Sequence, residues 1–224
     1  MTATAVFDLD GTLVDSAPDI AAAVNEALAR SGRAPLPVPQ VIGMVGNGAR
    51  RLVERALAAH DVSGDEAAVE AMLSAFESAY HLAPCRETRI YPGAEQTLAC
   101  LKSDGWRLAI CTNKPQRLAL DVISGLGLMD YFDAVVGGRD GVPLKPAAEM
   151  VRVAFEEAGA GDRRGVMIGD SRADLGAGRS AGIPVILVSH GYSDVAVSEL
   201  GADATVGSLE GAAAVIKKII MLER

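Results

Sequence analysis

Hydrophobic residues alternate along the chain between short continuous runs and longer stretches with helical spacing. The short runs lack polar alternation, which is typical of strands buried on both faces of a sheet. They fall at 5–7, 107–111, 134–136, 165–168 and 184–188, with helix-length segments at about 94–104, 115–126, 147–159, 173–181 and 209–222. This order predicts an α/β fold with a Rossmann-like, mostly parallel sheet flanked by helices.

One region interrupts the alternation. Between residues 16 and 84 no segment reads convincingly as a strand, and the apolar residues follow helical spacing, as in Ile20, Val24 and Leu28. A cluster of three prolines, at positions 35, 37 and 39, separates the first predicted helix from the second. We therefore expect an α/β core made of residues 1–15 and 85–224, with residues 16–84 forming an inserted α-helical domain.

Composition and charge limit the classes of function that the chain can have. The 224 residues are half hydrophobic and carry a net charge of −8, with Lys and Arg scattered. The chain has no basic stripe of the kind that would predict a nucleic-acid partner. It also has no apolar run that approaches the ~18 residues of a membrane span. No secretory signal opens the chain, and three cysteines without paired spacing favour reduced thiols in the cytoplasm. An acidic chain can still bind an anion where a metal, a well-placed Lys or Arg, or a helix N-terminus makes the site positive.

The most specific polar segment follows the first predicted strand. It places Asp8 and Asp10 on either side of a single residue, so that both carboxylates can face the same side, and Gly11 then allows a sharp turn. An Asp-x-Asp pair alone would fit an acidic turn equally well. The longer string Asp-x-Asp-Gly-Thr behind an apolar strand is much more specific.

Three further polar segments follow later predicted strands, where open α/β sheets bind their ligands. Taken singly, these segments would fit a helix cap, a surface lysine and a first-turn carboxylate. Those separate explanations do not account for all of these segments occurring together, one after another, at the ends of predicted strands. The segments contain Thr112 and Asn113, then Lys145 before a proline, then Asp170 and Asp174.

Together the four segments resemble the motifs of the haloacid dehalogenase superfamily of phosphohydrolases, and the resemblance covers nearly the whole chain. The insert looks like the helical cap of that superfamily. Within the superfamily, the chain is most similar to phosphoglycolate phosphatases. This similarity lies in residues 45–50 and 52–57 of the insert, in the opening Asp-Gly-Thr-Leu-Val-Asp-Ser-Ala-Pro and in the Gly-Asp-Ser-Arg segment. The chain departs from the common family pattern at Ala147, Ala148 and Ala173.

The resemblance implies a mechanism. Asp8 is expected to be the nucleophile that forms an aspartyl-phosphate, and Asp10 the acid and base. Lys145 is expected to hold Asp8 and the phosphate. The metal is expected to be Mg²⁺, which prefers oxygen ligands. Its implied ligands are Asp8, the Asp10 backbone carbonyl and Asp170, with Asp174 as support, while Thr112 and Asn113 bind phosphoryl oxygens.

The resemblance also implies a small phosphorylated substrate, 2-phosphoglycolate, hydrolysed to glycolate and phosphate by a monomer or homodimer. In the insert, Gly46, Asn47 and Arg50 are the candidate substrate contacts. Arg50 is expected to meet the substrate carboxylate. A glycine-rich turn leading into a helix is an equally good explanation of each single residue there.

Several related activities remain to be weighed. A phosphatase for another small ester, such as a sugar phosphate, is the main alternative. Asp10 disfavours a dehalogenase, which needs no acid at that position. A phosphonate-cleaving relative needs a lysine in the insert, yet the first lysine of the chain is Lys102. A hexose-phosphate mutase would share Asp8 and Asp10, and a non-catalytic scaffold would be expected to have lost one of the key groups.

Overall fold

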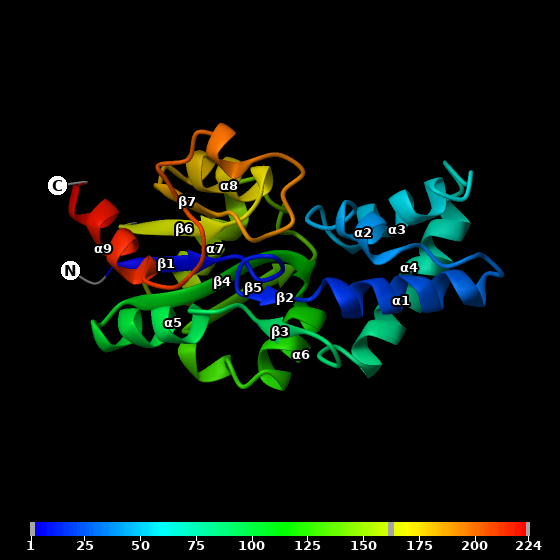
Figure 1. Cartoon of the computed structure of the whole chain (residues 1–224), viewed down its shortest axis with the longest axis horizontal. Helices are drawn as coiled ribbons and strands as arrows, with labels where there is room; N and C mark the ends of the chain where they lie inside the picture. Colours follow the sequence, from blue (N-terminus) through cyan, green and yellow to red (C-terminus); the bar gives the residue numbers. More distant parts are fainter. Residues whose placement is uncertain (1–2, 161–163, 223–224) are drawn as a thin grey trace.

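A six-stranded parallel sheet forms the centre of the core (Figure 1). The computed structural model describes residues 3–160 and 164–222. The strand order β5-β4-β1-β6-β7-β8 confirms the predicted mostly parallel sheet. Its strands are β1 (Thr4–Phe7), β4 (Arg107–Pro115), β5 (Ala134–Gly138), β6 (Gly165–Gly169), β7 (Val185–Val188) and β8 (Ala204–Val206). The sequence prediction missed β8, a three-residue strand whose side chains stay partly exposed.

Alternate residues of the strands pack into two hydrophobic cores, one on each face of the sheet. Phe7 faces the layer formed by α5 (Ala94–Ser103), α6 (Gln116–Gly125) and α9 (Ala212–Leu222). Val6 faces the layer formed by α7 (Glu149–Glu157) and α8 (Arg172–Ala181). This period of two is the reason that the strands read as continuous apolar runs. Short 3-10 turns lie at Met129–Tyr131 and Val197–Glu199.

The register of the sheet brings the functional segments together. Phe7 lies opposite Ile110 of β4 and Ile168 of β6, and all three strands run in the same direction. The polar residues that follow these three positions therefore emerge at one edge of the sheet. This is the edge at which open α/β sheets bind ligands.

The region 16–84 is helical, as the spacing of its apolar residues predicted. Its helices are α1 (Ala17–Arg30), α2 (Val38–Ile42), α3 (Ala49–Ala58) and α4 (Glu66–Leu82). Figure 1 shows these helices, blue to blue-green, grouped beyond the sheet on the side where strand β2 (Val14–Asp15) lies. We call residues 16–84 the helical insert.

Two segments connect the helical insert to the core. The strands β2 (Val14–Asp15) and β3 (Arg89–Ile90) form a small antiparallel ribbon, which the sequence prediction missed. Beside it, the buried carboxylate of Asp19 in α1 accepts hydrogen bonds from the backbone N–H groups of Glu87 and Thr88 and from the Thr88 hydroxyl. Asp19 thereby fastens the entering and leaving segments to each other.

Some predicted boundaries were wrong. Strand β4 continues to Pro115, so Thr112 and Asn113 lie in the strand instead of the loop beyond it. The helix after Lys145 begins at Glu149, two residues later than predicted, because residues 145–148 form a turn and a bend. The last helix begins at Ala212, three residues later than predicted. Among the described helices, none is both long and apolar enough to cross a membrane.

Candidate active site

Asp8 and Lys145 form a buried ion pair at the end of β1. The Lys145 Nζ lies 2.8 Å from Asp8 Oδ1, which also accepts a hydrogen bond of 2.7 Å from the Leu9 N–H. Lys145 Nζ donates further to the Cys111 carbonyl at 2.7 Å and to Asp174 Oδ1 at 2.6 Å. Burial alone would lower the pKa of Lys145, but the charges of Asp174 and Asp8 outweigh it and raise the pKa. The lysine is therefore a fixed positive charge.

Three buried carboxylates gather beside this lysine. Ligand oxygens of Asp8, Asp170 and Asp174 lie within 4.8 Å of one another. Burial, opposed in part by Lys145, raises the pKa of Asp8 to about 7. Burial and then the charge of Asp174 raise the pKa of Asp170 to about 8. Such a cluster of oxygen donors fits a hard divalent cation such as Mg²⁺, whose charge would offset the crowding of negative groups.

Asp174 differs from the other two acids, because its carboxylate accepts four hydrogen bonds from other groups of the protein. Its Oδ2 accepts from the N–H groups of Asp170 and Ser171 and from the Ser171 hydroxyl, while Oδ1 accepts from Lys145. Ser171 and Asp174 together form a capping box at the start of α8. These contacts fit a supporting role for Asp174.

Gly11 allows the chain to turn directly over the acidic cluster. Its φ of +82° lies in the left-handed region, and a Cβ there would lie 2.6 Å from Asp170 Oδ2. The next residue, Thr12, donates from its hydroxyl to Asp170 Oδ1 at 3.2 Å. The Tyr192 N–H donates to Asp170 Oδ2 at 2.6 Å. The turn after Asp10 therefore helps to fix the position of Asp170.

Asp10 lies apart from the acidic cluster and faces the helical insert. Its Oδ1 accepts from the Ser16 hydroxyl at 2.5 Å, and both of its carboxylate oxygens lie 3.1 Å from Lys114 Nζ. Lys114 also lies over the ring of Tyr80 in α4, 4.2 Å from its centroid. Burial would lower the pKa of Lys114, but Asp10 and then Tyr80 raise it on balance.

Lys114 was not among the predicted site residues. One signal was available: two residues after Thr112, Lys114 falls on the same side of an extended strand as the predicted phosphate-binding hydroxyl. Nothing in the sequence, however, indicated that Asp10 and Tyr80 would meet it there.

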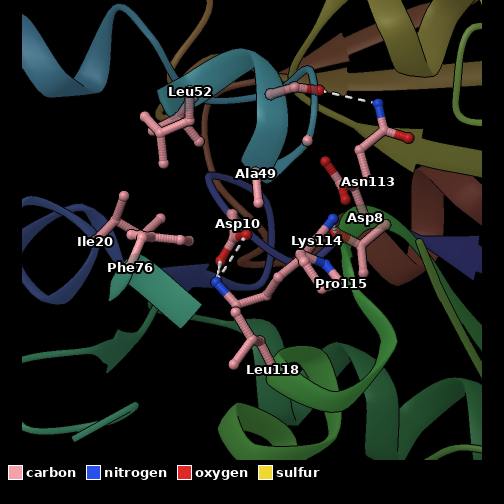
Figure 2. A pocket seen from close by; sticks show the side chains of 14 residues that line it. Asp8, Asp10, Ile20, Ala49, Leu52, Phe76, Asn113, Lys114, Pro115 and Leu118 are labelled. Carbon is pink, nitrogen blue, oxygen red and sulfur yellow. Dashed lines mark hydrogen bonds and ion pairs between the residues drawn. The ribbon is translucent and has the colours of Figure 1, made fainter. Parts of the chain in front are cut away.

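A small cavity of about 50 Å³ lies between the core and the helical insert (Figure 2). Asp8, Asp10 and Lys114 are the charged side chains that line it within the described part of the chain. The remaining lining is largely apolar on the side of the insert. It consists of Ile20, Val45, Gly46, Gly48, Ala49, Leu52, Phe76, Thr112, Asn113, Pro115 and Leu118.

Five of the ten predicted site residues line this cavity: Asp8, Asp10, Gly46, Thr112 and Asn113. Thr112 and Asn113 line it, and the Asn113 side chain joins three segments. Its amide nitrogen donates to the carbonyls of Gly46 and Lys145, and its oxygen accepts from the Lys145 N–H. Asn113 thereby links β4 with the loop that carries Lys145 and with the helical insert.

Two predicted residues of the insert are turned elsewhere. The guanidinium of Arg50 is paired with Glu66 at 2.5 Å and Glu70 at 2.6 Å, and the side chain is 41% exposed. Asn47 accepts from Arg55 at 2.7 Å and borders a neighbouring hollow. The cavity therefore receives the backbone of this glycine-rich turn, through Gly46, without the guanidinium that was expected to meet the substrate.

The fold and the site define a class of enzyme with a Rossmann-like core, in which a carboxylate pair, a buried lysine and an acidic cluster meet at the ends of parallel strands. The chain belongs to the haloacid dehalogenase-like hydrolases, because the model of that family matches residues 2–182.

Comparison with individual proteins gives the same class. A phosphoglycolate phosphatase of Cereibacter sphaeroides is 41% identical over 195 residues, which cover 87% of this chain and 88% of that protein. A phosphoglycolate phosphatase of Caulobacter vibrioides is 40% identical over 206 residues, covering 92% of this chain and 87% of that protein. The crystal structure of a predicted phosphoglycolate phosphatase from Haemophilus somnus aligns with a TM-score of 0.88 at 27% identity, covering 96% and 97% of the two chains. The chain is thus a phosphatase similar to these proteins.

Proposed function

We propose that this protein is a Mg²⁺-dependent phosphomonoesterase that hydrolyses 2-phosphoglycolate to glycolate and phosphate through an aspartyl-phosphate on Asp8. The observation that carries the proposal is the buried carboxylate of Asp8, held by Lys145 beside Asp170 and Asp174. The substrate is supported by the names of relatives that are about 40% identical over most of their length.

In the first step, Asp8 attacks phosphorus and the ester bond to the leaving oxygen breaks. Because Leu9 and Lys145 hold Asp8 Oδ1, we assign Oδ2 as the attacking oxygen. Lys145 is placed to offset negative charge on both Asp8 and the phosphoryl group. A Mg²⁺ ion held by Asp8, the Asp10 carbonyl and Asp170, with Asp174 in support, would supply the further positive charge that two approaching anions require.

Asp10 is the proposed acid and base. It would give a proton to the leaving oxygen, and then take a proton from the water that cleaves the aspartyl-phosphate. In the structure its carboxylate lies at the cavity wall, where Ser16 and Lys114 orient it. Thr112 and Asn113, the proposed phosphoryl-binding residues, border the same space, although the Asn113 amide already donates to the Gly46 and Lys145 carbonyls.

The helical insert is the proposed cap over the site. Its apolar side chains, among them Ile20, Leu52 and Phe76, face the charged groups of the core across the cavity. Such a wall would exclude bulk water from the aspartyl-phosphate and strengthen the electrostatic contacts around it. The small cavity fits a small ester. The three cysteines are free, which supports action in a reducing compartment such as the cytoplasm.

A panel of small phosphate esters tests the substrate directly. We expect hydrolysis to require Mg²⁺, to stop with EDTA and to return when Mg²⁺ is added in excess. Within the panel, 2-phosphoglycolate should have the highest kcat/KM. A higher value for a sugar phosphate would replace the proposed substrate by the alternative. No metal-dependent hydrolysis of any ester would contradict the proposed activity altogether.

A further inference from the structure

Among the residues that the structure describes, Lys114 is the cation that lines the cavity. The other buried lysine, Lys145, is 1% exposed at its side chain and donates to Asp8, Asp174 and the Cys111 carbonyl. Those three acceptors use all three ammonium protons of Lys145. Lys114 lines the cavity, and its ammonium lies against Asp10 and the Tyr80 ring. Two of its ammonium protons can bond the two Asp10 oxygens, which leaves the third for a second anionic group of a ligand.

The chemistry of the proposed substrate places such an anion close to Lys114. In 2-phosphoglycolate a single CH₂ group separates the leaving oxygen from the carboxylate. Asp10, the proposed donor to that oxygen, already touches Lys114 through both of its own oxygens at 3.1 Å. A group next to the leaving oxygen is consequently within reach of the same ammonium.

We propose that Lys114 is a specificity-determining residue, which binds the carboxylate of the leaving group and so selects acidic phosphate esters. This inference rests on the proposed function, since it assigns a residue to its substrate. The contact with Lys114 replaces the expected contact with Arg50, whose guanidinium is paired with Glu66 and Glu70.

The surroundings of Lys114 fit this role. The ring of Tyr80 supports the ammonium, and Phe76 packs on Tyr80 with ring centroids 5.8 Å apart. The side chain of Lys114 is 5% exposed. A lysine held in one place and shielded from water has lost its rotamer freedom before the ligand arrives, and its contact with a carboxylate is strengthened.

The experiment compares 2-phosphoglycolate with 2-phosphoglycolamide, which replaces the carboxylate by a neutral amide of the same shape. The wild-type protein should prefer the carboxylate by roughly 10- to 100-fold in kcat/KM, as expected of a charge-assisted contact. In Lys114→Met this preference should fall to about threefold or less, chiefly through a higher KM for 2-phosphoglycolate. Lys218→Met removes the same charge from an exposed helix position and should keep the wild-type preference.

The outcomes separate the two proposals. If the wild type hydrolyses other esters but neither compound, the proposed substrate fails and the role of Lys114 fails with it. If the wild type prefers 2-phosphoglycolate and Lys114→Met slows both compounds equally, only the role of Lys114 is overturned. Lys114→Gln, which keeps a donor for Asp10 without the charge, gives the same test if the methionine variant does not fold.

Discussion

Two buried lysines divide the acidic side chains of the site between them. Lys145 lies between Asp8 and Asp174, while Lys114 lies against Asp10. The two aspartates of the Asp-x-Asp pair consequently have different partners, although they are two residues apart. This division fits two different roles, because a nucleophile and a proton carrier need different surroundings.

The raised pKa values of Asp8 and Asp170 predict how Mg²⁺ binding depends on pH. Without metal, both groups bind protons near neutral pH, since their pKa values are raised to about 7 and about 8. A cation must displace those protons, so its affinity should weaken as the pH falls from 8 to 6, by up to about tenfold per pH unit for each proton released. Titration calorimetry over this range measures both the affinity and the protons released. An affinity independent of pH would contradict this assignment of the ligands.

At the scale of elements, the polar segments at the carboxyl ends of β1, β4 and β6 could be predicted from the sequence. Continuous apolar runs identify parallel strands, and the polar residues behind them fall at one edge for geometric reasons. The direction in which Arg50 and Lys114 point could not be predicted. It depends on contacts with α4, where Glu66 and Glu70 pair with Arg50 and the ring of Tyr80 lies against Lys114. Such contacts between distant segments leave no local pattern.

The junction between β6 and α8 predicts a large loss of stability in Asp174→Ala. The substitution removes an acceptor from Lys145 and leaves the N–H groups of Asp170 and Ser171 without their carboxylate partner. Removing one partner of a buried ion pair typically costs about 3–5 kcal/mol. Glu95→Ala, at an exposed first-turn position of α5, is the control and should change the free energy of unfolding by less than about 0.5 kcal/mol. Urea denaturation measures both, and a loss below about 1 kcal/mol for Asp174→Ala would show that these contacts are not critical to stability.

At the scale of the whole molecule, the cavity needs both parts of the chain. The core supplies the charged groups at the end of its sheet, and the helical insert supplies the apolar wall and the Gly46 carbonyl that holds Asn113. The ribbon of β2 and β3 and the contacts of Asp19 join the two parts beside the site. The helical insert, which begins directly after β2, therefore faces Asp8 and Asp10 across the cavity.

The most direct test of the account is acid-quenched mass spectrometry of Asp10→Asn during reaction with p-nitrophenyl phosphate and Mg²⁺. The p-nitrophenolate needs no proton to leave, whereas hydrolysis of the aspartyl-phosphate needs the base that this variant lacks. We predict that a phosphoryl group accumulates on the peptide that contains Asp8, and that Asp8→Asn with Asp10→Asn accumulates none. Phosphate released with no phosphoryl group on that peptide, or turnover near the wild-type rate in Asp8→Asn alone, would contradict the mechanism.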